Sequence, residues 1–326
     1  LASELASTKI VNIGAPIGTI TSDHLTAVSG RLGPTPQMIP FDLTLVAGGK
    51  EKKLRFALVN HPKLTPLLVA ITTFTGLSQN ALYGESTTLH LQGEIRVKGH
   101  STIRLENAYA PADVFSQDAF PIALAVQSSF MRLYTNTTEA PAVEGISLRV
   151  ESTPGRQSFT IDSAWLEKTE ARPGESVHVR VLLRPYRGPA RVADLTVRVP
   201  EQSAPGTVLR VLVSDADWLN RSTRGFSLPG IGVLFPPSDS GLEQLISVIN
   251  RERHNDRVYA GLFAPAPSLV WADKEMPNIP LSQVNVLDGR PGPGGIQYFR
   301  ESLASEDSLA LGGPVAGVIS LSLTVR

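Results

Sequence analysis

The chain has 326 residues, more than a single hydrophobic core usually supports (about 250–300 residues), and this length predicts two domains. Its 30 Lys and Arg balance 30 Asp and Glu, so the formal net charge is zero. With no excess positive charge and no basic cluster, the chain lacks the electrostatic drive that binds nucleic acid or an anionic membrane. We therefore exclude nucleic acid as an expected partner.

The sequence contains no cysteine, which excludes disulfides, thiolate nucleophiles and cysteine-ligated zinc or iron–sulfur sites. Its longest apolar runs, such as residues 67–71 and 122–126, are far shorter than the roughly 20 residues needed to cross a bilayer, and no membrane span is predicted. The sequence starts at Leu1 without a basic-then-apolar signal segment. We interpret it as a processed product or as part of a longer chain.

Alternating apolar and polar residues, typical of half-buried strands, recur along most of the chain and predict a mainly β fold with a few helices (α+β). Residues 87–107 predict a hairpin, because the alternation that precedes Lys98-Gly99 resumes after this turn signal. The other predicted strands are 41–45, 54–58, 146–150, 177–181, 195–199 and 319–325.

Three helices are predicted, and each is expected to cover a sheet. Thr65-Pro66 provides an N-cap followed by a first-turn proline. The second helix is expected over 120–133. Before the third helix, Ser240 and Glu243 are spaced as a capping box, and helically spaced apolar residues follow up to Arg251.

The second half of the chain predicts an antiparallel sandwich of immunoglobulin-like kind, because turn signals separate short strands at regular intervals. We place the domain boundary near residue 140, with a β-rich domain carrying two helices at 1–140 and the sandwich with one covering helix at 141–326. A Pro- and Gly-rich stretch at 290–295 is predicted to be a loop. The turn signals lie at 172–175, 186–189 and 204–206.

No catalytic residue is predicted. A serine hydrolase needs a base and oxyanion donors near its nucleophile, and the sequence has no Gly-x-Ser-x-Gly turn. For each histidine an ordinary structural role is the favoured interpretation: His90 and His178 on polar strand faces, His254 at a helix end, and His24 and His61 in loops. His100 is the sixth histidine.

No metal site and no cofactor are predicted either. The sequence has no His-x-His, no His-Glu-x-x-His and no calcium-loop spacing. Asp215 and Asp217 form an Asp-x-Asp that we interpret as solvated turn residues after a strand. Residues 14–18 superficially resemble a phosphate loop, but a proline lies in the middle and the Gly-Lys-Ser/Thr ending is missing.

Aromatic side chains could line a carbohydrate or peptide groove, but we expect most of them to pack inside the second domain. The exposed edges of a sandwich offer another possibility, in which a partner adds a strand. The aromatic residues in question are Trp165, Trp218, Tyr259, Phe263, Trp271 and Tyr298.

Short motifs along the chain resemble secreted bacterial proteins of the sporulation stage IV B (SpoIVB-type) serine peptidase family. The three at the N-terminal end, which we assign to residues 1–40, resemble the end of the peptidase domain, and the others resemble the domain that follows it. His24 stands where the family has a basic residue. The motifs are Ile17–His24, Gly30–Gly33, Met38–Pro40, Leu64–Pro66, Leu91–Gly93, Arg172–Glu175, Ile249–Arg251 and Ile279–Ser282.

The catalytic segments of that family are absent from this chain. The family's nucleophile lies in a Gly-Met-Ser-Gly-Ser-Pro type of segment and its base in a Gly-His-Pro type of segment. Asn60-His61-Pro62 lacks the glycine and follows the peptidase-like portion, so the role of the base is not transferred to it. The resemblance implies an extracytoplasmic, sheet-rich accessory region without its catalytic part.

The leading hypothesis is a non-catalytic structural or interaction module of a secreted or periplasmic bacterial protein, which could act within a surface assembly. Its expected partners are proteins: another copy of the chain, or the missing upstream segment. Two alternatives stay open, a downstream accessory part of a serine peptidase and a carbohydrate-binding sandwich.

Overall fold

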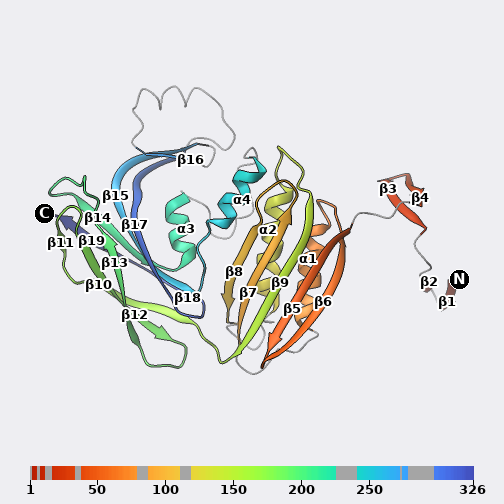
Figure 1. The fold of residues 1–326 in the computed structure, drawn as a ribbon, viewed down its shortest axis with the longest axis horizontal. Helices are drawn as coiled ribbons and strands as arrows, with labels where there is room; N and C mark the ends of the chain where they lie inside the picture. Colours follow the sequence, from red (N-terminus) through yellow and green to blue (C-terminus); the bar gives the residue numbers. More distant parts are fainter. Residues whose placement is uncertain are drawn as a thin grey trace.

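The computed structural model describes residues 2–5, 8–11, 17–33, 38–78, 87–110, 119–224, 241–271, 274–277 and 297–326. In these ranges the chain is mainly β, with four helices and several mixed and antiparallel sheets (Figure 1). Most strands belong to two lobes that lie side by side. This agrees with the mainly β fold expected from the alternating pattern.

The first lobe is built on a five-stranded sheet in the order β6-β5-β9-β7-β8. The parallel pair is β5 with β9, which aligns Phe41 with Ile146, and the other neighbours are antiparallel. The hairpin predicted at 87–107 is confirmed as β7 and β8. The strands are β5 (Met38–Ala47), β6 (Lys50–Val59), β7 (Thr87–Val97), β8 (Ile103–Tyr109) and β9 (Val143–Pro154).

Helices α1 (Thr65–Ser78) and α2 (Ala119–Tyr134) cover one face of this sheet, as expected (Figure 1). Helix α1 begins at Thr65, where the sequence predicts its start, but Thr65 does not make the expected N-cap bond. Its hydroxyl accepts a hydrogen bond from the His61 amide and donates one to the Val59 carbonyl, both before the helix. Apolar strand residues point toward the helices. The opposite face of the sheet is polar and charged, and there Arg55 pairs with Asp42.

The second lobe contains two sheets whose inner faces share one apolar core. One sheet has the order β13-β12-β10-β18 and the other β11-β19-β14-β15-β16, with β17 also paired to β15. Both sheets are mixed, because β10 pairs with β18 and β11 with β19 in parallel. The strands are β10 (Phe159–Leu166), β11 (Glu170–Ala171), β12 (Ser176–Pro185), β13 (Arg191–Arg198), β14 (Val208–Ser214), β15 (Arg257–Trp271), β16 (Lys274–Pro277), β17 (Gln297–Ala310), β18 (Val315–Ala316) and β19 (Val318–Val325).

Helix α3 (Ala216–Arg224) lies on the outer face of the second sheet, where Leu219 packs against Leu212 and Phe263. The solvated turn predicted at residues 215–217 is therefore wrong. Asp215 is the N-cap of a helix, since its Oδ1 accepts a hydrogen bond of 2.9 Å from the Trp218 amide.

Helix α4 (Leu242–Asn250) follows second-lobe strands in the sequence but packs into the core of the first lobe, as do the strand residues beyond position 140 in β9. The chain therefore passes from one lobe to the other and back. The predicted capping box is corrected: the N-cap is Gly241, which makes no side-chain cap bond, and Glu243 bonds Ser101 instead. Ser240 lies outside the described residues.

Two short hairpins precede the first lobe: β1 (Ala2–Leu5) with β2 (Thr8–Val11), and β3 (Gly18–His24) with β4 (Ala27–Leu32). The second hairpin lies apart from both lobes (Figure 1), and every residue of β4 is exposed. His24 ends strand β3, whereas the sequence suggested a loop. The loop predicted at 290–295 and residues 14–16 of the glycine-containing segment lie outside the described residues.

Candidate functional site

One end of the first lobe, where α4 packs, brings together a serine, a histidine and two glutamates, a combination of residue types that can form a catalytic site. The His100 imidazole lies between carboxylates, with Nε2 3.2 Å from Glu139 Oε1 and Nδ1 3.3 Å from Glu243 Oε2. Ser101 donates to Glu243 twice, from its amide at 2.9 Å and from its hydroxyl at 2.5 Å. These bonds from Ser101 lower the pKa of the Glu243 carboxyl.

This arrangement differs from that of a serine nucleophile. In a catalytic triad one imidazole nitrogen accepts the hydroxyl proton and the other bonds the carboxylate. Here both nitrogens of His100 face carboxylates, and the Ser101 hydroxyl donates to Glu243 rather than to the ring. The cluster joins the turn between β7 and β8 to the first turn of α4. Sequence reasoning missed it, because its members come from three separate segments.

Two asparagines attach the end of α4 and the loop that follows it to the edge strand β8. The Asn250 side-chain amide accepts from the Arg104 amide at 2.8 Å and donates to the Thr102 carbonyl at 2.9 Å. The Asn255 side chain likewise accepts from the Ala108 amide at 2.7 Å and donates to the Ala108 carbonyl at 2.8 Å. Each side-chain amide thus replaces the peptide group of a neighbouring strand, and this covers the edge of the sheet.

An arginine–glutamate ion pair and a histidine–glutamate contact lie in the same region. The Arg132 guanidinium on α2 is only 6% exposed and lies 2.7 Å from Glu252. His254 Nδ1 lies 3.6 Å from a carboxylate oxygen of Glu106 on β8. A buried arginine needs such a partner, because an unpaired buried charge costs several kcal/mol.

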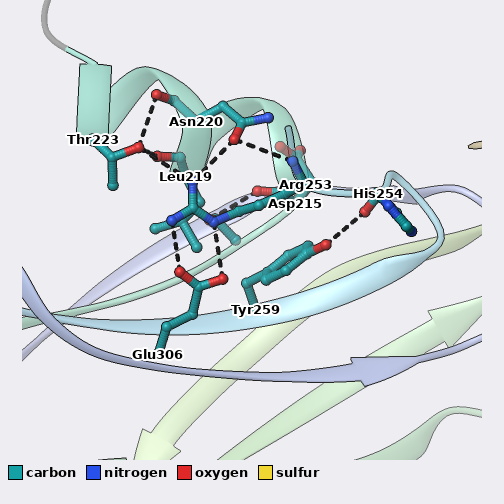
Figure 2. Close-up of polar contacts among 9 residues, drawn as sticks. Asp215, Leu219, Asn220, Thr223, Arg253, His254, Tyr259 and Glu306 are labelled. Atoms are coloured by element: carbon teal, nitrogen blue, oxygen red, sulfur yellow. Dashed lines mark hydrogen bonds and ion pairs between the residues drawn. The ribbon is translucent and has the colours of Figure 1, made fainter. Parts of the chain in front are cut away.

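Arg253 is the centre of a polar cluster in the second lobe (Figure 2). Its Nε and Nη2 donate to the two oxygens of Glu306 at 2.9 and 2.6 Å. Its Nη1 donates to Asn220 at 3.0 Å and to Thr223 at 3.2 Å, both on α3. Each guanidinium nitrogen therefore has a protein partner, and Arg253 serves to hold α3 against β17.

Tyr259 completes this cluster from β15. Its hydroxyl donates to the His254 carbonyl at 2.9 Å (Figure 2). Burial raises the pKa of the Tyr259 phenol to about 12, so the hydroxyl stays protonated as the donor. The loop that leads from α4 to β15 is thereby fixed on both sides.

A small cavity of about 230 Å³ lies beside Arg253. Its charged lining groups are already paired, Arg253 with Glu306 and Glu301 with Arg210 Nε at 2.7 Å. Its volume is below the lower limit of typical ligand pockets, about 300 Å³. The lining residues are Ser222, Thr223, Arg253, Phe263, Glu301, Ser302 and Leu303.

The other polar residues that the sequence analysis considered lie in contacts within the fold. Asp215 Oδ2 accepts from the Gly317 amide at 2.9 Å in addition to capping α3. Burial and the neighbouring Asp215 charge raise the pKa of the Asp217 carboxyl. His178 Nδ1 lies 3.4 Å from the Thr196 hydroxyl on the next strand, and His61 Nδ1 accepts from the Lys63 amide at 3.3 Å. Within the described ranges, no three His, Asp or Glu side chains gather closely enough to hold a metal ion.

The aromatic side chains divide between core and surface. Tyr259 and Phe263 are buried, whereas Trp165 and Trp218 are 40% and 43% exposed. Trp165 points away from the core, since Ala164 and Leu166 on either side pack into it. Trp218 lies on α3, which covers the outer face of the other sheet of the second lobe. The two tryptophans therefore face away from each other; the side chains of Trp271 and Tyr298 lie outside the described set.

The most unusual surface is the outer face of α1 and α2. These helices of 14 and 16 residues contain one charged residue, Arg132, which is buried. The rings of Phe74 and Phe120 join the helices edge to face, with centroids 6.4 Å apart. Exposed apolar patches of this kind mark interaction sites. We call this surface the apolar helix face; its large exposed residues are Leu64 (47%), Leu67 (48%), Ile71 (51%), Phe120 (55%) and Leu124 (45%).

Comparison with protein-family models, curated proteins and solved structures finds no match. None of the helices in the described parts of the chain combines the length and the hydrophobicity required to cross a bilayer.

Proposed function

We propose that this chain is a non-catalytic structural and interaction module that recognises other proteins. The observation that carries this proposal is the apolar helix face. Four large side chains, each about half exposed, lie there on two nearly uncharged helices, and a fifth, Leu64, directly precedes α1. The polar groups that could suggest catalysis support the same conclusion, because His100, Ser101 and Arg253 are engaged in contacts that hold the fold together.

The proposed location is extracytoplasmic, in a secreted or periplasmic bacterial protein and within a surface assembly. This part of the proposal depends on the resemblance to the region that follows the peptidase domain in the sporulation stage IV B family. An immunoglobulin-like relationship of the second lobe belongs to the same proposal and is supported by its two facing sheets. The order β13-β12-β10 within one sheet differs from the order of an immunoglobulin domain, in which consecutive strands B and C lie in different sheets.

A cleavage assay tests the non-catalytic proposal. The purified full chain should release no peptide from casein or from a peptide library beyond the rate of a buffer control. The variants Ser101→Ala, His100→Ala, His61→Ala and His24→Ala should match the wild type. Cleavage that is lost on changing Ser101 or any of these histidines would overturn the proposal.

A second candidate, a downstream accessory part of a serine peptidase, is favoured by the β3–β4 hairpin. Ile17, Ile20, Val28 and Leu32 are at least 61% exposed, and a two-stranded hairpin needs further packing to be stable. A peptidase domain could supply that packing. The coding sequence upstream of Leu1 tests this idea: Gly-Met-Ser-Gly-Ser-Pro and Gly-His-Pro types of segment would support it, and their absence would exclude it.

The carbohydrate-binding alternative receives no support from the tryptophans. A sugar platform needs aromatic rings that lie side by side, whereas Trp165 and Trp218 lie on opposite outer faces of the second lobe. Binding of the chain on a glycan array would reverse this conclusion.

A further inference from the structure

We infer that the apolar helix face binds the same face of a second copy of the chain, forming a twofold-symmetric dimer. The inference rests on the proposed function and names the partner. In a twofold interface the same patch is contributed by both subunits, so the patch must be complementary to itself. Leu67, Ile71, Phe120 and Leu124 form such a patch, because apolar side chains can pack on one another in either subunit.

The distribution of charge favours this partner. A charged patch that met its own copy would place like charges close together, which costs several kcal/mol. The outer face of α1 and α2 has no charged side chain, since Arg132 is buried against Glu252. The opposite side of the lobe differs, because Asp42, Arg55 and Glu94 are exposed on the open face of the sheet. The absence of charge is therefore confined to the helical side.

The size of the face suits a small dimer interface. Fourteen helical residues extend for about 21 Å, and packed neighbouring helices lie about 8–10 Å apart. With their side chains the two helices present a surface roughly 20 Å in each direction, which is about 400 Å² in projection and about half of the approximately 800 Å² of accessible surface that each partner buries in a standard interface. Phe120 adds an aromatic side chain of a type enriched in interfaces.

A lipid surface fits less well. Helices that lie on a membrane place Lys and Arg beside their apolar face to contact anionic lipids. Here Lys63 is exposed beside Leu64, but α1 itself has no basic residue and the single arginine of α2 is turned inward. We therefore choose a second copy, and vesicle binding becomes an outcome that would contradict it.

Sedimentation equilibrium of the full chain tests the inference. The wild type should sediment as a dimer. Ile71→Lys and Leu124→Glu should each raise the dissociation constant at least about tenfold, because each places like charges in the interface. An equimolar mixture of the two variants should dimerise better than either alone, since opposite charges then meet. Val192→Lys is the matched control, because Val192 is 51% exposed on β13 in the other lobe.

The outcomes separate this inference from the proposed function. A monomeric wild type at about 100 μM, or a dimer that neither variant weakens, would overturn the inference. Binding of the chain to anionic vesicles that is lost in Ile71→Lys would also overturn it. Circular dichroism verifies folding, and Leu67→Lys replaces any variant that fails to fold. A monomeric chain without peptidase activity would refute the dimer but leave the proposed function intact. Cleavage that depends on His100 would refute the proposed function, whether the chain is a monomer or a dimer.

Discussion

Arg253 shows how single residues determine the internal contacts of the second lobe. Its side chain is 16% exposed and bonds both oxygens of Glu306. Arg253→Lys should lower the free energy of unfolding by about 2 kcal/mol, because an ammonium cannot reproduce the two parallel bonds. Urea denaturation measures this change.

A surface pair provides the control for Arg253. Arg184 also bonds two oxygens of one carboxylate, at 3.0 Å each to Asp162, but the two side chains are 64% and 37% exposed. Arg184→Lys should change the free energy of unfolding by less than about 0.5 kcal/mol. Equal effects of the two substitutions would show that Arg253 is not a structural clamp.

Glu243 should make the packing of α4 in the first lobe depend on pH. The bonds from Ser101 hold the pKa of this carboxyl below its ordinary value. A carboxyl with a lowered folded-state pKa stabilises the fold at pH values above its unfolded pKa, and this stabilisation is lost as the pH falls through the folded pKa. The wild type should therefore be more stable than Glu243→Gln at pH 7, and the difference should vanish in strong acid.

Thermal melting of both proteins across this pH range measures the effect. Glu144→Gln, on an exposed glutamate of β9, controls for the loss of one surface charge. A wild-type advantage over Glu243→Gln that stayed constant down to strong acid would refute the assignment to the Glu243 carboxylate.

Individual elements could be predicted from local patterns where one face is buried and the other is solvated. In β7, Leu89, Leu91 and Ile95 alternate with polar residues, and in α1 Thr65 marks the start of the helix. The sequence did not predict helix α3, because its apolar pattern is weak. Leu219 is the one large apolar side chain that α3 buries, and its N-cap is Asp215. Local pattern also could not reveal the lobe to which α4 belongs.

Helix α4 should couple the stability of the two lobes. Ile246 is fully buried in the core of the first lobe, although α3 and β15, the described elements that precede and follow α4, belong to the second. Ile246→Ala should lower the free energy of unfolding by about 2–5 kcal/mol, because it leaves a cavity. Leu124→Ala, at a position that is 45% exposed, should cost far less. Denaturation followed by circular dichroism measures both.

Hydrogen exchange can show which part of the structure the Ile246→Ala substitution loosens. Ile246→Ala should accelerate exchange of the β8 amides that Asn250 and Asn255 hold, including those of Arg104 and Ala108. Unchanged exchange in β8 would show that the packing of α4 does not hold Asn250 and Asn255 against this strand.

At the scale of the whole molecule, long-range contacts set the limit of sequence reasoning. The parallel pairing of β5 with β9 aligns Phe41 with Ile146, and no local pattern identifies neighbours so distant in the chain. The cluster of His100, Ser101 and Glu243 has the same origin, because Glu243 arrives on α4. The sequence allowed the types of element to be inferred, whereas this cluster required the folded structure.

Site-specific photocrosslinking in the native protein examines the proposed role of the apolar helix face, with a photoreactive amino acid at the position of Ile71 and, as a control, at Val192, both 51% exposed. Position 71 should yield a covalent adduct with the mass of two chains, and position 192 should yield little. The proposal fails if position 71 gives no adduct or if both positions give equal adducts.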